Sequence, residues 1–355
     1  MTAACEPTSY AAVAVRLQGK ALGDRVPISG TFDLTARCNL RCGHCYVANR
    51  RSSGGALADL PTERVLAVLE QAAEAGCLWL GLTGGEPLLR SDFAEIYSRA
   101  RRLGFLVTVL TNGTLVTPAL AARFADLPPC SIDVTLYGFT SDTYRHVTGF
   151  AEARDAAFRG VDLLLGRGVR VALKTTLSTI NEAELESLRR HAAAVGLRLR
   201  VDGLLHGALD GTPLEQGLRL PPERAARVHL DDEAARDGWR EQDRRVREGG
   251  NDRLFACAAG RGAFHVDSGG RLTPCLMVRE PAFDLGRGAF LDGWNGVIRE
   301  AVERPRSDSS PCRGCADAGF CEVCPGWSAV ESGDPEARVD HLCRVARERA
   351  SVLAA

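Results

Sequence analysis

The amino-acid sequence predicts an α/β fold, a partial (β/α)6 TIM-like barrel followed by a small Cys-rich domain. Strand-like and helix-like segments alternate six times between residues 26 and 205, and a glycine follows four of the predicted helices. Most of the cysteines outside the first predicted loop lie after residue 256. Consecutive strand-helix units imply right-handed crossovers and therefore a parallel, barrel-like sheet.

Short runs rich in Val, Leu, Ile or Thr predict six buried parallel strands. They cover residues 26–35, 77–83, 105–111, 131–137, 169–176 and 197–204. Because barrel enzymes keep their chemistry at the carboxyl ends of the strands, functional residues are expected in the loops that follow these runs.

Helical patterns separate the predicted strands. They cover residues 61–75, 91–103, 118–125, 153–167 and 182–195. Pro61 suits a first helical turn and Ser91 suits an N-cap. The glycines that close four of these helices are expected stop signals: Gly76, Gly104, Gly168 and Gly196.

The sequence outside the barrel divides by composition. We expect an N-terminal extension over residues 1–25, the barrel over 26–205, a charged connector over 206–256, a Cys-rich domain over 257–345 and a tail over 346–355. The Cys-rich part is also rich in Gly and Pro and lacks long periodic runs. Such a segment cannot build a large core and is expected to fold around metal.

Charge and hydropathy exclude several classes of protein. The 355 residues carry 44 basic and 45 acidic side chains, a formal net charge of -1. This balance supplies no field for nucleic acid or an anionic membrane. The longest apolar runs are strand-sized, and no basic segment followed by an apolar one opens the chain. We therefore expect a cytoplasmic protein without nucleic-acid or membrane partners.

Cysteine usage points to metal or redox chemistry. Thirteen cysteines, an odd number, occur without an export signal, so a disulfide framework is not expected. The segment Cys38-x3-Cys42-x2-Cys45 directly follows the first predicted strand. Three such thiolates can hold three irons of a 4Fe-4S cluster and leave the fourth iron open. The alternatives are buried free thiols or a zinc knuckle, although a structural zinc site needs a fourth ligand.

This cysteine loop resembles that of the radical S-adenosylmethionine (SAM) enzymes. A second match is Thr83-Gly84-Gly85-Glu86-Pro87, which is similar to the glycine-glycine-glutamate segment of that family. The resemblance implies that the backbone and the carboxylate of this segment hold the amino group of SAM. Glycines permit a close approach of the backbone to the ligand, and Glu86 can accept a charge-assisted hydrogen bond from the ammonium group. Alone, the segment could be a plain turn. The resemblance also implies reductive cleavage of SAM to a 5'-deoxyadenosyl radical.

Further SAM-pocket residues follow from the same resemblance. His44 is expected near the adenine, and Asn112, Thr135 and Lys174 at the ends of later strands. Asn112 and Thr135 could instead be turn formers, and Lys174 could cap a helix or pair with an acid. Cys130 is a candidate radical-quenching thiol. Cys5 and Cys77 are assigned to no cluster, and Cys77 is expected to be a small core residue.

The C-terminal cysteines resemble the SPASM extension of radical SAM enzymes, which holds auxiliary iron-sulfur clusters. The matching elements are Cys257, Gly270-x4-Cys275, Cys312-x2-Cys315-x5-Cys321-x2-Cys324 and Cys343, although the final gap usually has three residues. The resemblance assigns an inner cluster to Cys257, Cys275 and Cys324. It assigns an outer cluster to Cys312, Cys315, Cys321 and Cys343. The fourth inner iron would be open or bound by another side chain; a zinc clip is the alternative.

The resemblance implies a peptide-modifying maturase that acts on a precursor peptide, forming a crosslink or a related modification. Sulfatase-maturase-like side-chain oxidation and small-molecule or cofactor biosynthesis are alternatives, as is a non-catalytic iron-sulfur or zinc protein. Because the first 25 residues are too few for a leader-binding domain, we expect leader recognition by a separate protein or by the barrel and the Cys-rich extension themselves. Flavodoxin or ferredoxin is the expected electron donor.

Overall fold

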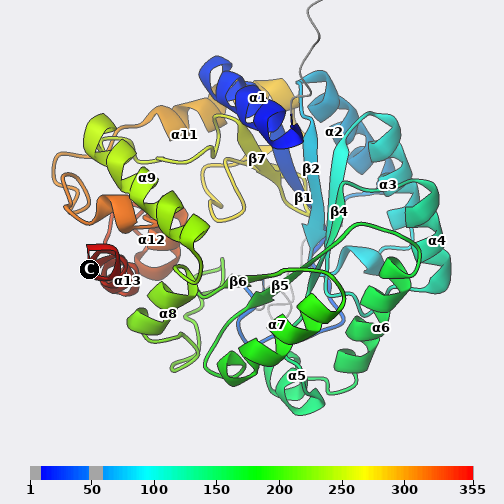
Figure 1. Cartoon of the computed structure of the whole chain (residues 1–355). Coiled ribbons are helices and arrows are strands. Elements are labelled where there is room, and N and C mark those ends of the chain that lie inside the picture. Colours follow the sequence, from blue (N-terminus) through cyan, green and yellow to red (C-terminus); the bar gives the residue numbers. More distant parts are fainter. Residues whose placement is uncertain (1–8, 48–58, 355) are drawn as a thin grey trace, which may run out of the picture.

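The computed structural model describes residues 9–47 and 59–354. Its centre is a nine-stranded sheet with the order β6-β5-β4-β3-β2-β1-β7-β8-β9. The first six strands pair in parallel and curve into a partial barrel with helices on its outside (Figure 1). They are β1 (Ser29–Thr35), β2 (Trp79–Gly84), β3 (Leu106–Thr111), β4 (Ser131–Thr135), β5 (Val171–Thr176) and β6 (Leu199–Asp202). The predicted partial barrel is confirmed.

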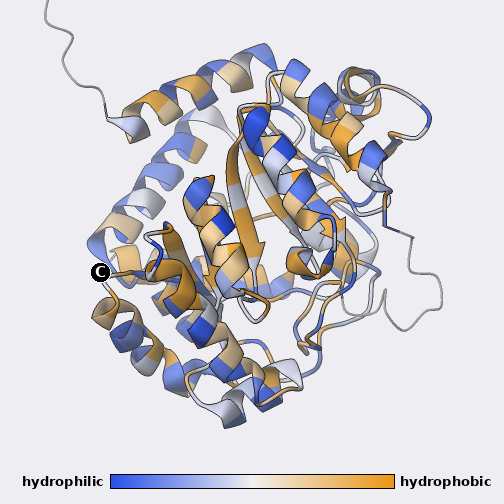
Figure 2. Ribbon diagram, turned by 90° about the vertical axis from the view of Figure 1, so that its right-hand side faces the viewer, coloured by the Kyte–Doolittle hydropathy of each residue, from blue (hydrophilic) through white to orange (hydrophobic). Residues whose placement is uncertain are grey.

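Five outer helices follow the predicted helical patterns. They are α2 (Thr62–Glu74), α3 (Phe93–Arg102), α4 (Pro118–Asp126), α6 (Ala153–Leu165) and α7 (Leu185–Ala194). In α2 the buried residues recur at the spacing of a single helix face: Val65, Val68, Leu69 and Ala72. Figure 2 shows largely hydrophobic strands behind helices whose outward turns are largely hydrophilic. The sheet and the inner helix faces therefore share one core.

The glycine stop signals are confirmed, whereas one helix start differs from prediction. The four glycines after the helices have φ of 98°, 94°, 69° and 73°, in the left-handed region that favours glycine: Gly76, Gly104, Gly168 and Gly196. The N-cap of α3 is Asp92 rather than Ser91. The Asp92 side chain makes no capping hydrogen bond and is instead engaged by a buried arginine described below.

Among the α-helices from α1 to α7, two were not predicted. One is α1 (Tyr10–Asp24), which occupies the predicted extension and is largely exposed. The other is α5 (Ser141–Thr148), which lies between β4 and α6. It begins at Thr140, whose side chain accepts a hydrogen bond from the Thr143 N–H, and ends at Gly149 with φ of 82°. Eight residues are too few to show a clear apolar period.

The Cys-rich C-terminal part continues the barrel sheet. Strand β7 (Ala263–Val266) pairs in parallel with β1, and β8 (Arg271–Thr273) and β9 (Phe283–Asp284) follow in antiparallel order. Phe264 and Trp294 pack into the same hydrophobic core as the barrel strands. Pairing with β7 covers the edge that β1 would otherwise expose.

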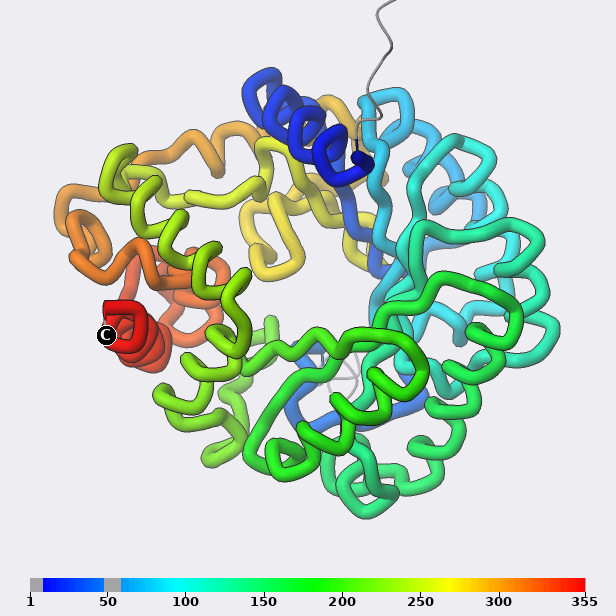
Figure 3. Tube along the Cα trace, in the orientation of Figure 1, coloured from blue at the N-terminus to red at the C-terminus, as the bar shows by residue number. Residues whose placement is uncertain are grey.

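The remaining helices surround the other side of the molecule (Figures 1 and 3). They are α8 (Pro222–Val228), α9 (Glu233–Gly249), α10 (Phe290–Gly293), α11 (Arg299–Glu303), α12 (Pro325–Ser332) and α13 (Asp340–Ala354). The predicted connector is therefore partly helical. The predicted tail over residues 346–355 lies largely within α13, where Ala346 and Arg349 are buried. No helix in the described ranges is long and apolar enough to cross a membrane.

Candidate active site

The cysteine loop leaves the carboxyl end of β1 and rests on α5. The Arg41 N–H donates to the Thr148 carbonyl at 2.9 Å, and the Gly43 N–H donates to the Val147 carbonyl at 3.1 Å. The Cys38 sulfur accepts hydrogen bonds from the Leu40 N–H at 3.4 Å and the Asn112 amide at 3.8 Å. The unpredicted helix α5 is thus the platform that shapes the loop.

The three loop thiols share one environment with Tyr137. Burial raises the pKa of Tyr137 well above its usual value, and the nearby thiols of Cys42, Cys45 and Cys38 raise it further. A hydrogen bond to Cys42 contributes to the same shift. Because one phenol senses all three sulfurs, the loop gathers its thiols on one side, as three ligands of one cluster require.

A cavity of about 510 Å³ opens at the carboxyl ends of the strands, beside the cysteine loop. It is lined by nearly all residues that the sequence proposed for the SAM site: Cys38, Cys42, Cys45, His44, Gly84, Gly85, Asn112, Thr135 and Lys174. Burial lowers the pKa of His44 to about 4, so its ring is neutral at physiological pH. This ring lies 5.8 Å from the Tyr137 ring, between centroids.

Glu86 differs from the expectation that its carboxylate faces SAM. The side chain is fully buried and does not line the cavity. It accepts hydrogen bonds from the Thr111 hydroxyl and the Asn112 N–H, each at 2.8 Å, and from the Leu88 N–H at 3.1 Å. Burial raises its pKa to about 7, against the effect of these hydrogen bonds. Glu86 therefore positions the ends of β2 and β3, and Pro87, in the 3-10 helix η2 (Pro87–Leu89), is also buried.

The two glycines before Glu86 permit a close backbone approach. A Cβ atom on Gly84 would lie 2.3 Å from the Thr35 carbonyl oxygen, and one on Gly85 would lie 2.2 Å from the Arg37 carbonyl oxygen. The Gly85 N–H donates to Thr35 at 2.7 Å and the Glu86 N–H donates to Arg37 at 2.8 Å. The segment is glycine-rich because it packs directly against the chain that enters the cysteine loop.

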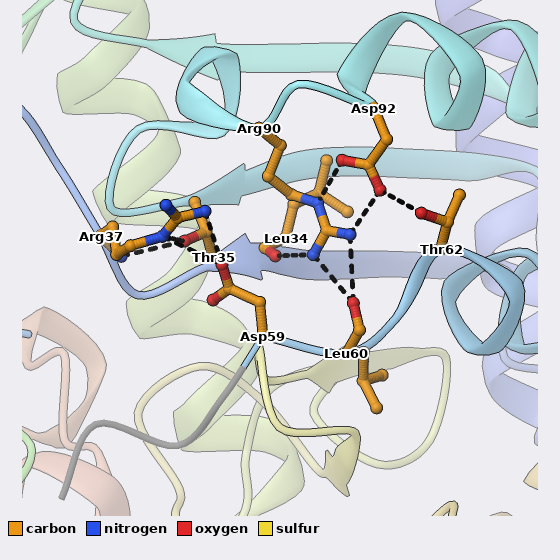
Figure 4. A network of polar contacts seen from close by, with 8 residues as sticks. All are labelled: Leu34, Thr35, Arg37, Asp59, Leu60, Thr62, Arg90 and Asp92. Carbon is orange, nitrogen blue, oxygen red and sulfur yellow. Dashed lines mark hydrogen bonds and ion pairs between the residues drawn. The ribbon is translucent and has the colours of Figure 1, made fainter.

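A buried arginine fastens this junction (Figure 4). The Arg90 guanidinium donates to the Leu34 carbonyl at 2.8 Å, to the Leu60 carbonyl at 3.0 Å and to Asp92 at 2.6 and 2.8 Å. The hydrogen bond from Arg90 lowers the pKa of Asp92 to about 2. The Thr62 hydroxyl also donates to Asp92, at 2.6 Å. Arg90 thereby ties the end of β1 to η2 and to the start of α2.

The C-terminal thiols form an inner set of three. Burial raises the pKa of Cys275 to about 12, and the nearby Cys324 and Cys257 raise it further. The pKa of Cys324 is also raised by burial and by Cys257. All three line a hollow of about 810 Å³ between α9 and the C-terminal loops.

A second set contains four thiols. Burial raises the pKa of Cys321 to about 12, and Cys343, Cys312 and Cys315 raise it further. The pKa of Cys343 is raised by burial, by Cys312 and by Cys315. Cys321 of this second set also lines the hollow that contains the inner set. A coordinated thiol is deprotonated, so these thiols would each lose their proton on binding metal, against the raised pKa that they have without it.

Among residues 9–47 and 59–354, no three His, Cys, Asp or Glu side chains converge as the ligands of a single metal ion would.

Other cysteines lie away from these sites. Cys130 immediately precedes β4, so it lies at the amino end of the barrel and does not line the cavity. The structure therefore gives no support to Cys130 as a radical-quenching thiol, because it lies at the opposite end of the strand. Cys77 is buried in the core, where burial raises its pKa to about 12. Cys5 lies outside the described residues.

Several cavity residues were missed by sequence reasoning, among them Tyr46, Tyr137, Arg200, Asp202 and His206. Arg200 and Asp202 alternate with buried or half-buried apolar residues along β6, as Lys174 and Thr176 do along β5. This alternation of polar residues on the face toward the barrel lumen is the sequence pattern that could have identified the missed cavity residues.

Comparison with known proteins agrees with the cysteine loop and the glycine segment. The profile of the Radical SAM superfamily matches residues 33–192, which include both. The chain carries a radical SAM domain. This domain extends from β1 to α7 and contains the cysteine loop, while the C-terminal thiols lie outside it.

Relatives of the radical SAM domain include haem-type and peptide-maturing enzymes. Pre-heme d1 synthase of Dinoroseobacter shibae is 36% identical, over 44% of this chain and 38% of its own length. Fe-coproporphyrin III synthase of Methanosarcina barkeri is 30% identical, over 46% of this chain and 40% of its own length. The chain thus spans about two fifths of these relatives. Mycofactocin maturase MftC of Mycobacterium tuberculosis is 26% identical over 84% of this chain and 78% of its own length.

Solved structures show the same fold around the radical SAM domain. Streptococcus suis SuiB bound to S-adenosylmethionine superposes with a TM-score of 0.68 at 16% identity, covering 96% of this chain and 82% of SuiB. anSMEcpe with bound AdoMet gives a TM-score of 0.67 at 14% identity, covering 92% of this chain and 96% of anSMEcpe. The likeness covers the Cys-rich C-terminal region as well as the partial barrel.

Proposed function

We propose that the protein is a radical SAM/SPASM enzyme that matures a ribosomally synthesised peptide. It would cleave SAM reductively to a 5'-deoxyadenosyl radical, which abstracts hydrogen from the peptide. The observation that carries this proposal is the single cavity shared by the cysteine loop and the Gly84–Gly85 segment. The extended similarity to MftC, over 84% of the chain, supports a peptide substrate, as does the likeness in fold to SuiB, which has also been solved bound to a precursor peptide.

The residues of the loop fit the groups that this chemistry needs. Cys38, Cys42 and Cys45 would hold three irons of a 4Fe-4S cluster. When bound, the cluster would supply one electron and SAM would supply the 5'-deoxyadenosyl radical, so the reactivity belongs to the cofactors and not to protein side chains. The backbone of Gly84 and Gly85 can accept hydrogen bonds from the SAM ammonium group. Neutral His44 lines the wall where the adenine is expected, with Asn112 and Thr135 completing the pocket.

The C-terminal thiols are proposed to hold two auxiliary 4Fe-4S clusters. The ligands of the inner cluster would be Cys257, Cys275 and Cys324, and those of the outer cluster Cys312, Cys315, Cys321 and Cys343. Since the inner set contains three thiols, its fourth iron would be open to substrate or bound by another side chain. An open iron would favour formation of a bond to sulfur.

A second candidate function is a modification in haem-type cofactor biosynthesis. The relatives with 36% and 30% identity are a pre-heme d1 synthase and an Fe-coproporphyrin III synthase, over less than half of this chain. Incubation with the precursor peptide or with a porphyrin, followed by mass spectrometry, separates the two candidates.

We further propose flavodoxin or ferredoxin as electron donor, a separate leader-recognition protein and a cytoplasmic location.

The first experiment is anaerobic reconstitution followed by a dithionite assay for 5'-deoxyadenosine. Replacing Cys38, Cys42 and Cys45 together with Ala is expected to abolish SAM cleavage and to remove about four irons of about twelve. Cys77→Ala is the matched control, since Cys77 is a core residue away from the cavity. If the triple variant still forms 5'-deoxyadenosine, the proposed function is wrong.

A further inference from the structure

An open hollow lies in the C-terminal region, on the side of the molecule that carries α8, α12 and α13 (Figure 1). This α13 hollow lies between residues 219–222, the end of α12 and the first turn of α13, and its volume is about 510 Å³. None of its lining residues lines the cavity beside the cysteine loop. A hollow of this size can hold a small organic molecule. Part of its wall is apolar: Leu220, Pro221, Pro222 and Val339.

Three arginines line the α13 hollow, and two of them have no acidic partner. The Arg219 guanidinium donates to the Leu205 carbonyl at 2.7 Å and forms an ion pair with Glu331. The side chains of Arg338 and Arg344 form no ion pair or hydrogen bond with the residues that the structure describes. Both guanidinium groups therefore remain available for charge-assisted hydrogen bonds to an anion.

The acids of the hollow do not neutralise these two cations. Glu331 is held by Arg219 and accepts a hydrogen bond from the Trp327 indole at 2.5 Å. Asp340, the other acid, is exposed in the first turn of α13 and forms no ion pair within the described ranges. Two unpaired arginines against one acid leave the hollow with a positive charge in excess.

His341 is a buried polar side chain of the hollow. The residue is 7% exposed, lines the hollow, and has a ring nitrogen, Nε2, without a hydrogen bond to any described residue. Burial lowers the pKa of His341 to about 4, and Arg219 and Arg344 lower it further, so both guanidinium groups lie near a neutral ring. A neutral imidazole can donate one N–H. Buried polar atoms are nearly always paired, so this ring points to a ligand that completes the site.

The first turn of α13 also favours an anion in this hollow. The helix has 15 residues, and Asp340 and His341 of its first turn line the hollow. The first N–H groups of a helix have no acceptor within the helix and carry partial positive charge, which favours phosphate at that end. The helix end, the unpaired arginines and the histidine therefore all favour the same kind of ligand.

We propose that the α13 hollow binds a phosphate group, either inorganic phosphate or the phosphate of a small organic molecule. Guanidinium groups and a helix N-terminus together match the several oxygens of a phosphate. The apolar wall at residues 220–222 would cover the organic part of a larger ligand. Since the hollow lies outside the cavity of the radical SAM domain, this inference does not depend on the proposed function.

Protection of arginines from phenylglyoxal tests the proposal. Anaerobic holoenzyme with saturating SAM is treated briefly with this arginine-specific reagent, and labelling of single arginines is measured by mass spectrometry. The probes are inorganic phosphate, adenosine 5'-monophosphate, adenosine and sodium chloride, all at equal ionic strength. We expect phosphate, the monophosphate or both to slow labelling of Arg344 several-fold. Arg347 is the internal reference, because it lies on the same helix, is 62% exposed and does not line the hollow.

The pattern of protection identifies the source of the phosphate group. Protection by inorganic phosphate that equals or exceeds protection by the monophosphate indicates a site for phosphate itself. Stronger protection by the monophosphate indicates a phosphorylated small molecule whose organic part contacts the apolar wall. The proposal is overturned if neither compound protects Arg344, or if adenosine or sodium chloride protects it equally well.

Two variants of the hollow should change the affinity in opposite directions. Isothermal titration calorimetry of the holoenzyme measures binding of the compound that protects Arg344 more strongly. Arg344→Gln should weaken binding several-fold, and Asp340→Asn should strengthen it, because this change removes a negative charge from the hollow. Arg347→Gln should leave binding unchanged. Equal affinity in Arg344→Gln and Asp340→Asn would overturn the proposal.

Arg338 is left unchanged in these variants, because its charge also acts on the thiols of Cys312 and Cys343. Iron content and formation of 5'-deoxyadenosine, measured on the same preparations, should be equal in all variants. These two measurements report on the proposed function independently of phosphate binding.

Discussion

At the scale of single residues, several groups form hydrogen bonds to the cysteine sulfurs beside the cavity. Cys38 accepts hydrogen bonds from Leu40 and Asn112, and Cys42 interacts with the Tyr137 hydroxyl. Such hydrogen bonds help to set the reduction potential of an iron-sulfur cluster, because they stabilise the more negative, reduced state. Sequence motifs identified the ligands, but not these neighbours, since Tyr137 belongs to no motif and reaches the loop only through the fold.

Tyr137→Phe is expected to lower the reduction potential of the cluster held by the loop. The change removes one hydrogen-bond donor to Cys42 and keeps the ring beside His44. A potentiometric titration followed by electron paramagnetic resonance measures the shift. Tyr97→Phe is the control, because the Tyr97 hydroxyl donates to the Leu127 carbonyl on the outside of the barrel. An unchanged midpoint potential in Tyr137→Phe would contradict the assigned hydrogen bond.

Glu86 predicts a pH dependence of stability. Its folded-state pKa of about 7 lies above the ordinary value of 4.5, so the stability that Glu86 contributes is fully present below pH 4.5 and is lost as pH rises through 7. Between pH 5.5 and 8 the loss would be about 2 kcal/mol. In Glu86→Gln this decline should disappear, although the amide leaves one of the three donors without an acceptor. Urea unfolding of the anaerobic holoenzyme at several pH values measures it.

The exposed Glu74→Gln variant provides the comparison for this experiment. It should keep the pH dependence of the natural protein. If Glu86→Gln shows the same pH dependence as Glu74→Gln, then Glu86 does not titrate in this range.

At the scale of secondary-structure elements, apolar periodicity located the six barrel strands and five of the outer helices. It failed for α5, whose eight residues bury only Tyr144, Val147 and Thr148. Yet α5 supports the cysteine loop through two backbone hydrogen bonds. The sequence could place the ligands at the end of β1, but not the platform beneath them, because the supporting contacts span more than a hundred residues.

The junction of β1, η2 and α2 should depend on Arg90. Replacing Arg90 with Met removes the guanidinium donors to the Leu34 and Leu60 carbonyls and to Asp92, which keeps only the Thr62 hydroxyl. Because this arginine is buried, we expect a loss of about 3 kcal/mol in unfolding free energy. The loop that begins at Cys38 should also reconstitute with less iron.

Arg99→Met is the matched control for Arg90→Met. The Arg99–Glu70 ion pair lies on the surface, with side chains 40% and 44% exposed, so its loss should cost about 0.5 kcal/mol. Chemical denaturation and iron analysis of both variants make the comparison. Equal stability of the two variants would show that the network in Figure 4 does not hold the junction.

At the scale of the whole molecule, the C-terminal region is joined to the barrel. Strand β7 pairs with β1 across more than two hundred residues of sequence. No local pattern reports such a pairing, because a four-residue strand fits many partners. The assignment of the C-terminal thiols to two sets rests on resemblance to a cysteine spacing, which does not depend on knowing the sheet.

Arg349 links the barrel to the loop between Cys321 and Cys324. The residue is 1% exposed, and its guanidinium carbon lies 4.0 Å from the centroid of the Trp239 ring. The guanidinium group donates hydrogen bonds to the Phe320 carbonyl at 3.0 Å and to the Glu322 carboxylate at 2.7 Å. It also contacts His229, which lies beside Asp202 at the end of β6. One side chain thus connects the cavity wall to the auxiliary thiols.

Arg349→Met should release the Cys321–Cys324 loop without disturbing the cysteine loop of the barrel, because no contact of Arg349 reaches β1 or α5 among the residues described. We expect reconstituted iron to fall by about four to eight of about twelve, while 5'-deoxyadenosine formation without substrate persists. Arg347→Met is the control, since Arg347 is 62% exposed and its nearest acid, Asp317, is 3.7 Å away. Iron analysis and the dithionite assay for 5'-deoxyadenosine distinguish the outcomes. A full iron content in Arg349→Met would mean that the auxiliary thiols keep their geometry without Arg349. Loss of SAM cleavage would mean that the barrel and the C-terminal region cannot be reconstituted with iron independently.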